Sequence, residues 1–385
     1  MTRALTLTLV AALATLVVAP ISSGAKRMDI GLFDDRSFGL LESSPQITQR
    51  AASDGARIIR TLADWADIAA VKPSKAKNPG DPAYDFSQLD RVVENADAAG
   101  MKVLISIYNV PGWANGGKGS HFVPKKAKFM RDFAQAVATR YSGKFGGLPK
   151  VSKYTLGNEV NTSRFLMPQF AKQGRKAVGA RNYVRKVYLP GYAGLKKGNR
   201  KAQIAIGPTS PRGRKSGRQK GAGQAYPATF WRQVANECRG KCKFAAVAHH
   251  PYNFPGGKKG PKGKLKWPSI GMTSMNRFSR SLRGWFNLRK TPKIWITEYG
   301  FPTSPPFPGP APTVSKQAKF LTQSVKMVKK MGFVEMYVWF IYEDDEGSSN
   351  DTVWQASGGL ITMADTDKPS RAAFQKAAKS VKPLK

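Results

Sequence analysis

The chain has 385 residues, with 63 Lys and Arg against 24 Asp and Glu, so its formal net charge is +39. With 41% hydrophobic residues and 8 Trp it can build a large core, of a size that suits one large α/β barrel or two ordinary domains. The positive charge attracts any polyanion, including nucleic acid, anionic cell-wall polymers, acidic polysaccharide and anionic lipid surfaces. It does not select among them, and a solubilising basic surface without a dedicated partner is an equal alternative.

Residues 1–25 have the pattern of a secretory signal peptide. Arg3 gives a positive start, Ala4 to Ile21 is almost wholly apolar, and Ser23, Gly24 and Ala25 form a small-residue cleavage pattern. We predict cleavage after Ala25, which leaves 26–385 as one secreted, extracellular catalytic domain. The alternative is an uncleaved membrane anchor, since the apolar run is near the lower length limit for spanning. No later segment is long and apolar enough to cross a bilayer.

Cys238 and Cys242 are the two cysteines of the chain. In an exported protein such a pair is expected to form a disulfide that closes a tight local loop. Two thiols with no nearby His make a poor zinc site, so we expect no metal here.

Apolar runs of strand length alternate with helical patterns along the rest of the chain. Eight strands are predicted, at 28–33, 56–62, 101–108, 151–157, 202–207, 244–248, 293–297 and 334–341. Helices are predicted at 46–54, 86–99, 124–141, 183–197, 230–238, 275–288, 315–331 and 371–381.

Eight apolar strands, each followed by a helix or a helix-sized gap, predict an α/β fold: a single closed (β/α)8 TIM barrel with basic loop insertions. The strands are almost continuously apolar, as parallel strands buried on both faces are. The alternative is an open doubly wound sheet. It is disfavoured because Asp34 and Asp35, rather than a Gly-rich phosphate loop, follow the first strand.

Two glutamates stand where predicted strands end. Glu298 follows 293–297, and Asn158 and Glu159 follow 151–157. A carboxylate is costly to bury unpaired, so one at the end of an apolar strand needs a reason. For one glutamate alone, a salt bridge or a surface position is the simpler explanation. Two such acids predict one shared site at the carboxyl ends of the strands, where TIM barrels keep their chemistry.

Other polar and aromatic residues follow further strands, and barrel geometry brings them to the same face. They are Arg60, Asn109, Trp113, His249, His250, Tyr252 and Trp339. Two acids with an Arg, an amide, imidazoles, a phenol and indoles are the groups needed to cleave a glycosidic bond: one carboxyl protonates the leaving oxygen, the other attacks or shields the anomeric carbon, and flat rings stack on sugar faces.

The order of these residues resembles glycoside hydrolase clan A, whose members are retaining (β/α)8 barrels. Asn158-Glu159 and Glu298 look like the paired acids of that clan, and Arg60, His250-Pro251-Tyr252 and Trp339 match its further site positions. Residues 103–114 are similar to the third-strand segment of family 39 and family 5-like enzymes. Family 5 cellulases place a His after the third strand, where this chain has Tyr108 and Asn109, so a cellulase is not implied.

The resemblance implies a double displacement in which Glu159 is acid and then base and Glu298 is the nucleophile. The substrate-binding positions that it implies are Asn158 for the sugar 2-hydroxyl, Tyr252 as a donor to Glu298, Trp113 and Trp339 as a sugar platform, and Arg60 and His250 beside the acids. Packing at the barrel rim is the alternative for both Trp, and a plain salt bridge is the alternative for Arg60. His249 is expected to be structural.

Two Gly-rich basic segments, 212–220 and 257–264, follow the fifth and sixth strands and so belong to the face that carries the acids. They indicate an anionic substrate, a tether to an anionic polymer or cell wall, or simple solvated insertions. They lack interleaved aromatic residues, so dedicated nucleic-acid recognition is not predicted. The acidic run Asp344, Asp345 and Glu346 is expected to be a solvated loop.

The sequence therefore predicts a secreted retaining glycoside hydrolase that cleaves β-linked poly- or oligosaccharide without a cofactor or metal. The alternative is a non-catalytic barrel protein that binds an anionic cell-wall polymer or polysaccharide.

Overall fold

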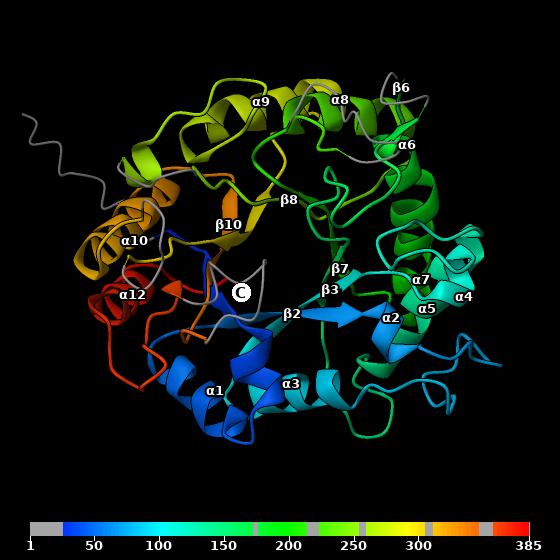
Figure 1. Ribbon diagram of the computed structural model, residues 1–385, viewed down its shortest axis with the longest axis horizontal. Helices are drawn as coiled ribbons and strands as arrows, with labels where there is room; N and C mark the ends of the chain where they lie inside the picture. The colour runs from blue at the N-terminus through cyan, green and yellow to red at the C-terminus, as the bar shows by residue number, and fades with distance from the viewer. Residues whose placement is uncertain are drawn as a thin grey trace, which may run out of the picture.

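The fold is a closed eight-stranded parallel barrel surrounded by helices, as Figure 1 shows in a computed structural model. The structure describes residues 26–171, 176–213, 223–253, 259–304, 311–345 and 357–384. Neighbouring barrel strands follow the order β1-β10-β9-β8-β7-β4-β3-β2, and pairing of β1 with both β2 and β10 closes the ring. The predicted α/β TIM barrel is confirmed, and the open sheet is excluded.

The barrel strands match the eight predicted apolar runs to within a few residues. They are β1 (Asp29–Phe33), β2 (Ile58–Asp64), β3 (Lys102–Tyr108), β4 (Lys153–Leu156), β7 (Gln203–Thr209), β8 (Ala246–His249), β9 (Ile294–Tyr299) and β10 (Val334–Phe340). Two short strands, β5 (Phe170–Ala171) and β6 (Lys176–Ala177), pair with each other in the loop after β4.

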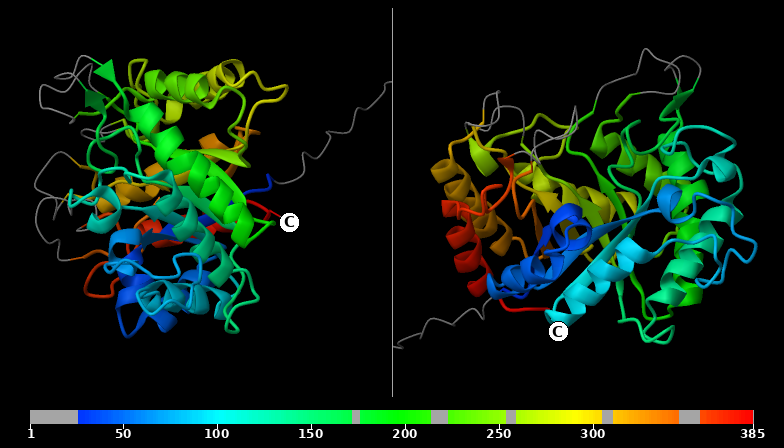
Figure 2. Two further views of the ribbon diagram at one scale, coloured as in Figure 1. Left: turned by 90° about the vertical axis from the view of Figure 1, so that its right-hand side faces the viewer. Right: turned by 60° about the horizontal axis from the view of Figure 1, so that its bottom comes forward.

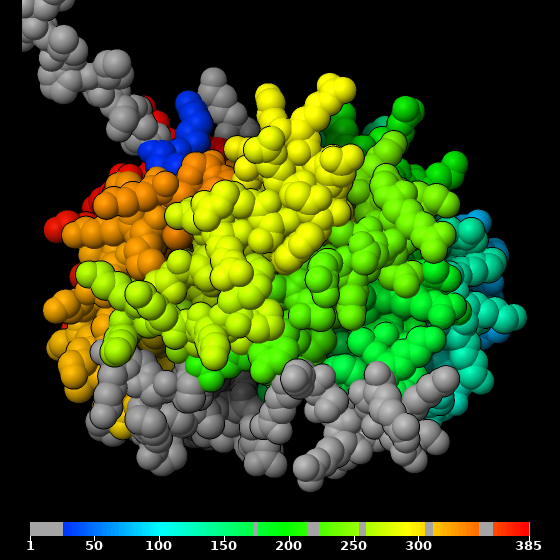
Figure 3. Space-filling view, turned by 90° about the horizontal axis from the view of Figure 1, so that it is seen from above, coloured from blue at the N-terminus to red at the C-terminus, as the bar shows by residue number. Residues whose placement is uncertain are grey.

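The helices lie outside the strands. Those of eight residues or more are α1 (Ser44–Ser53), α3 (Ser87–Ala98), α5 (Ala127–Arg140), α7 (Leu189–Gly198), α8 (Pro227–Cys238), α9 (Met275–Trp285), α10 (Val314–Lys329) and α12 (Pro369–Lys379). Shorter ones are η1 (Arg36–Leu40), α2 (Trp65–Ile68), α4 (Gly112–Asn115), α6 (Gly179–Asn182), η2 (Tyr183–Tyr188), η3 (Gly260–Lys262) and η4 (Met272–Ser274). In the space-filling view of Figure 3, the segments around α8, α9 and α10 follow one another across one face, coloured from green through yellow to orange.

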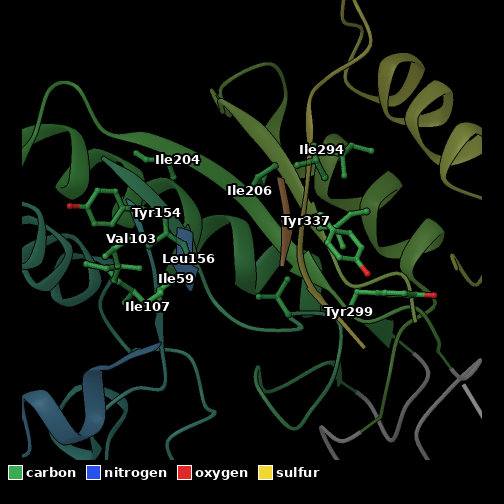
Figure 4. Packing of buried hydrophobic residues seen from close by; sticks show 14 of the residues in the cluster. Ile59, Val103, Ile107, Tyr154, Leu156, Ile204, Ile206, Ile294, Tyr299 and Tyr337 are labelled. Atoms are coloured by element: carbon green, nitrogen blue, oxygen red, sulfur yellow. The ribbon is translucent and has the colours of Figure 1, made fainter. Parts of the chain in front are cut away.

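Side chains alternate between two apolar layers along each strand, as the period of two requires. On β10, Met336 and Val338 face the barrel interior, where they pack with Trp295. Tyr337 and Trp339 face the helices instead. Figure 4 shows this outer layer, which includes Tyr337 and residues from five other strands. Because both layers are apolar, the sequence shows continuous apolar runs.

The amino end of the barrel holds both ends of the described chain. Arg27 and Lys382 form a parallel bridge, and the Met28 amide donates to the Lys382 carbonyl. Figure 2 shows the last residues beside the first strand on one face of the molecule. Asp29 is fully buried there and accepts from Lys102 Nζ at 3.1 Å.

The predicted disulfide between Cys238 and Cys242 is present at the end of α8. Among the described residues, no helix has the length and apolar character needed to cross a bilayer. The predicted signal peptide, residues 1–25, lies outside the described residues, as do 214–220 and 257–258 of the two basic segments and Glu346 of the acidic run.

Asp344, which the sequence analysis placed in a solvated loop, is instead buried. Its carboxylate accepts from Lys368 Nζ and from the Gly359 amide, each at 2.8 Å. This pairing fixes the segment after β10 against the start of α12, so Asp344 has a structural role.

Candidate active site

Arg60 lies at the centre of the carboxyl-end mouth of the barrel and is completely buried. It faces the interior from β2, and its guanidinium lies 4.3 Å from the ring centroid of Phe33. Nη1 donates to Glu298 Oε2 at 2.9 Å and Nη2 to Asn158 Oδ1 at 2.8 Å. Nε donates to Ser106 Oγ at 3.1 Å. A buried cation is stable when charge and hydrogen bonds meet it on several sides, and these contacts fix the positions of both expected site residues.

His250 brings the two expected catalytic glutamates together. Its Nδ1 lies 3.1 Å from Glu159 Oε1 and 3.6 Å from Glu298 Oε2. Its Nε2 lies 3.0 Å from the hydroxyl of Thr297. Carboxylates only accept hydrogen bonds, so the Nδ1 proton points at the acids and Nε2 accepts from Thr297 when the ring is neutral. Glutamates 139 positions apart in the sequence thus share one imidazole edge.

The separation of the two acids bears on stereochemistry. The two distances from Nδ1 limit the separation of Glu159 Oε1 and Glu298 Oε2 to a span that includes the spacing of retaining pairs and extends into the lowest part of the range for inverting pairs, ~6.5–9.5 Å. Retaining pairs lie closer, at about 5–5.5 Å. The side chains of Glu159 and Glu298 keep 19% and 14% of their surface exposed, so both reach the mouth.

Glu298 is held from two sides. Tyr252, from the segment after β8, donates its hydroxyl to Oε1 at 2.9 Å, while Arg60 donates to Oε2. Burial raises the pKa of Glu298, but the attraction of His250 and Arg60 and the hydrogen bonds from Tyr252 and Arg60 outweigh it, so the pKa lies below its ordinary value. This carboxylate is therefore ionised at neutral pH and aimed by its partners.

Glu159 has an unusual backbone. Its φ is +34°, a region that residues with side chains rarely adopt, and Gly157, two residues before it, has φ +98°. The turn directs Asn158 at Arg60 and Glu159 at His250. Strained backbone is found most often at functional sites, where the surroundings hold it in place.

Further polar residues lie at the ends of β1, β2 and β3. Asp64 accepts from Asn109 Nδ2 at 2.6 Å and caps α2 by accepting from the Ala66 amide at 2.9 Å. Asp35 accepts from the Thr61 hydroxyl at 2.7 Å. Burial raises the pKa of Asp35 to about 7, although hydrogen bonds from Thr61 and Leu62 oppose the shift.

The aromatic residue expected to face the mouth from β10, Trp339, points the other way. Trp339 is fully buried in the helix-facing layer, where its ring packs near Phe301 and Nε1 donates to the Gly358 carbonyl. Phe340 is the partly exposed aromatic that faces the interior, 5.2 Å from Phe33 between ring centroids. Trp339 is therefore not exposed to the barrel mouth, and Phe340 is the aromatic residue of β10 that is.

Trp113 also lies away from the acids. Its Nε1 donates to the Ala69 carbonyl at 2.7 Å, and its ring packs edge-on against Trp65 and Phe129. The alternative of rim packing therefore describes Trp113. His249 is buried between the Thr209 hydroxyl and the Ile270 carbonyl, and burial lowers its pKa to about 3, as a structural histidine requires.

Several residues of the network were not found from the sequence. Ser106 and Thr297 are small polar residues inside apolar strands, and Phe33 and Phe340 look like ordinary core residues. Their common signal is position: each is an inward-facing residue near the carboxyl end of its strand. Among the described residues, no group of three or more His, Cys, Asp or Glu could hold a metal ion.

Comparisons with known proteins agree with this geometry. Residues 199–366 match the model of a family described as glycosyl hydrolase catalytic core. Residues 199–366 are therefore similar to a glycosyl hydrolase catalytic core. The matched range includes β7 to β10, and with them His250, Tyr252 and Glu298, while Arg60 and Glu159 come from the part of the barrel before it. A comparison with curated proteins finds no match.

Solved structures of glycoside hydrolases share the fold of this core and its barrel. A family 39 glycoside hydrolase from the gut symbiont Bacteroides cellulosilyticus WH2 is 18% identical, with a TM-score of 0.62 over 92% of this chain and 64% of that one. A monomeric β-xylosidase from Caulobacter crescentus CB15 is 19% identical, with a TM-score of 0.60 over 91% and 67%. A GH5_18 protein from Streptomyces cattleya, solved in complex with GlcNAc, is 15% identical, with a TM-score of 0.61 over 94% and 83%.

The chain thus spans about two thirds of the length of the family 39 structure. At these identities the likeness shows the fold alone. The family model and the closed barrel together support the prediction of a glycosidase catalytic core, and the barrel is the fold that the resemblance to clan A implies.

Proposed function

We propose that this protein is a secreted retaining glycoside hydrolase that cleaves β-linked poly- or oligosaccharide. The observation that carries the proposal is the shared contact of Glu159 and Glu298 with His250 Nδ1 at the barrel mouth. The depressed pKa of Glu298 supports its role as the nucleophile, because a nucleophilic carboxylate has to be ionised. Export rests on the signal-peptide pattern of residues 1–25.

In the first step a Glu298 oxygen attacks the anomeric carbon while the C1–O bond to the leaving group breaks. Glu159 gives its proton to the departing oxygen, and a glycosyl-enzyme forms. In the second step Glu159 removes a proton from water, the water oxygen bonds to the anomeric carbon, and Glu298 leaves. Tyr252 and Arg60 keep Glu298 in place throughout and stabilise the negative charge that returns to it.

Asn158 is suited to hold the sugar 2-hydroxyl. Its carbonyl oxygen is occupied by Arg60, and no described residue accepts from its amide N–H₂ group. That group is left to donate to a substrate hydroxyl, a bond that strengthens as positive charge develops on the sugar ring. Phe340 supplies a partly exposed aromatic ring next to Phe33, over which the Arg60 guanidinium lies.

The test is hydrolysis of a panel of nitrophenyl glycosides by the parent chain and by Glu298→Gln, with Glu335→Gln as the control. Glu335 pairs with Lys293 at the start of β10, so the control variant loses the same charge as Glu298→Gln but at the other end of the barrel. We expect kcat to fall at least about a thousandfold in Glu298→Gln and to stay within about twofold in the control.

Two further readouts separate the finer claims. NMR of the first product should show a retained anomer, whereas an inverted one would exclude double displacement. Glu159→Gln should slow substrates with poor leaving groups far more than nitrophenyl glycosides, because only the former need a proton donor. N-terminal sequencing of protein from the culture medium should begin at Lys26.

The alternative function is a barrel that binds an anionic cell-wall polymer or polysaccharide without cleaving it. The net charge of +39 favours it. Equal activity of Glu298→Gln and the parent would support this alternative, and so would polymer binding without any hydrolysis.

A further inference from the structure

A pocket of about 430 Å³ opens on the outer wall between the start of α5 and the segment α6–η2. The lining residues are Ala127, Val178, Arg181, Asn182, Arg185 and Lys186, so three cations and no acid face it. Figure 1 shows α5 and α6 on the same side of the barrel, opposite α10. None of these residues takes part in the network around Glu298.

The cations of this rim pocket, defined by the six lining residues, are only partly neutralised. Arg185 is paired with Glu237 at 2.9 Å. Arg181 is exposed, and no described acid lies within ion-pair distance of it. Lys186 Nζ donates to the Lys125 carbonyl at 2.6 Å, which fixes its charge at the pocket edge. Residues four apart on a helix lie on one face, so Arg181 and Arg185 present adjacent guanidinium groups.

The remaining lining fits a sugar. Asn182 donates through Nδ2 to the Pro168 carbonyl at 2.9 Å, which leaves its amide oxygen to accept from a hydroxyl. Ala127 and Val178 provide an apolar surface for the face of a pyranose ring. α5 begins at Ala127 with no side-chain cap and no acid in its first turn, so the positive end of its dipole adds to the field of the three cations.

The pocket is tied to the loop that carries Glu159. Gln169 is buried and donates through Nε2 to the carbonyl of Val160, the residue after Glu159, at 2.9 Å. Its own carbonyl accepts from the amides of Val178 and Gly179 at 2.9 and 3.0 Å. Gln169 therefore links the residue after Glu159, through its side chain, to the pocket residue Val178, through its backbone carbonyl.

We propose that the rim pocket binds an anionic polysaccharide, one whose sugar rings carry carboxylate or sulfate groups. Guanidinium groups pair with both anions through two parallel hydrogen bonds. The Asn182 amide and the apolar surface of the pocket suit a sugar ring. The pocket lining has no aromatic ring to stack on a base, so nucleic acid is a poorer fit. Binding here requires no chemistry at Glu298, so the binding proposal can be tested independently of the proposed activity.

The test measures binding of polygalacturonate and of dextran sulfate at about 0.15 M NaCl by the parent chain and two triple variants. The first variant is Arg181→Gln, Arg185→Gln and Lys186→Gln. The control is Lys319→Gln, Lys326→Gln and Lys330→Gln, three exposed residues on and just after α10 that carry the same charge. Neutral dextran and a duplex DNA serve as further probes.

We expect the pocket variant to raise the Kd for at least one anionic polysaccharide about tenfold, since three rim charge contacts are lost. The control should change it less than about threefold, because it removes only long-range attraction. The two polymers tell whether the pocket prefers carboxylate or sulfate. Arg181→Gln alone, at a position without an ion pair, should reproduce about a third of the effect in free energy and does not disturb Lys125 or Glu237.

Two results would overturn the proposal. Equal weakening by both triple variants would show that the overall charge attracts the polymer and the pocket does not. Tighter binding of duplex DNA than of either polysaccharide, lost in the pocket variant alone, would assign the pocket to nucleic acid.

Discussion

Charged side chains are buried at both ends of the barrel, and the two ends differ in what those charges are free to do. At the amino end, Lys153 is 7% exposed, its Nζ lies 2.8 Å from Gln203 Oε1, and it sits 5.0 Å from the ring centroid of Trp295. Asp29 beside it is closed off by Lys102 and by the Leu384 amide. The hydrogen-bonding partners of Lys153 and Asp29 are local, and these contacts do not link the two side chains into a larger network.

At the carboxyl end, the charges are linked through shared partners. Arg60 contacts Glu298 and Asn158, and His250 contacts both glutamates. Both carboxylates also keep exposed surface. A network with open acceptors can exchange protons and bind hydroxyls, whereas isolated closed pairs only add to or subtract from stability.

The largest effect is expected from removing the central cation of the network. Arg60→Met should lower kcat/KM at least about a thousandfold, because Glu298 and Asn158 lose the group that positions them. The free energy of unfolding should fall by about 3–5 kcal/mol, since a buried carboxylate is left without its partner. Urea unfolding and nitrophenyl glycoside kinetics measure both.

Arg60→Lys is the matched control for Arg60→Met. It keeps the charge but lacks the planar fork that reaches Glu298 and Asn158 together, so its activity should lie between those of the parent and the Met variant. Full activity in either variant would contradict a network centred on Arg60.

A smaller effect is expected from the aromatic residues at the end of β10. Phe340→Ala should raise KM about tenfold, which is the size of a lost stacking contact. Trp339→Phe should leave KM unchanged and lower the free energy of unfolding by about 1–2 kcal/mol, because it shrinks a buried side chain. The reverse pattern would restore Trp339 as the platform.

The smallest effect is expected at the amino end. Lys153→Met keeps the length of the side chain and removes a buried charge, so at pH 7 the variant should match the parent or exceed its stability by up to about 1 kcal/mol. Activity should stay within about twofold of the parent. A tenfold loss of activity would show that the two ends of the barrel are coupled.

The stability difference between Lys153→Met and the parent should change with pH in one direction. Burial lowers the pKa of Lys153 below its ordinary value of 10.5, so between the two values the unfolded chain holds more protons than the folded one. The stability contribution of Lys153 therefore rises with pH through this window. The advantage of Lys153→Met should shrink as the pH approaches 10.5, as unfolding curves at a series of pH values would show.

The number of strands and the order of the main site residues could be predicted from the sequence. Parallel barrel strands are apolar on both faces, so each leaves an uninterrupted run, and polar residues that end such runs point to the mouth. Glu159, Glu298, His250 and Tyr252 carry that signal, and Arg60 is a charged residue inside such a run.

The register of β10 could not be predicted. Trp339 and Phe340 are both aromatic, so alternation gives no preference between the interior and the helices. The burial of Asp344 could not be predicted, because its partner, Lys368, comes 24 residues later and is one of many lysines in so basic a chain. Trp113 follows a strand, but its indole turns back to the carbonyl of Ala69, which belongs to the preceding loop.

The bridge between Arg27 and Lys382 has a practical consequence. It places both ends of the described chain at the amino-end face, across the full depth of the barrel from Glu159 and Glu298. A fluorophore, an affinity tag or a solid support attached through either end would therefore leave the catalytic opening facing outward. Immobilised protein should accept long polymers as readily as the free form does.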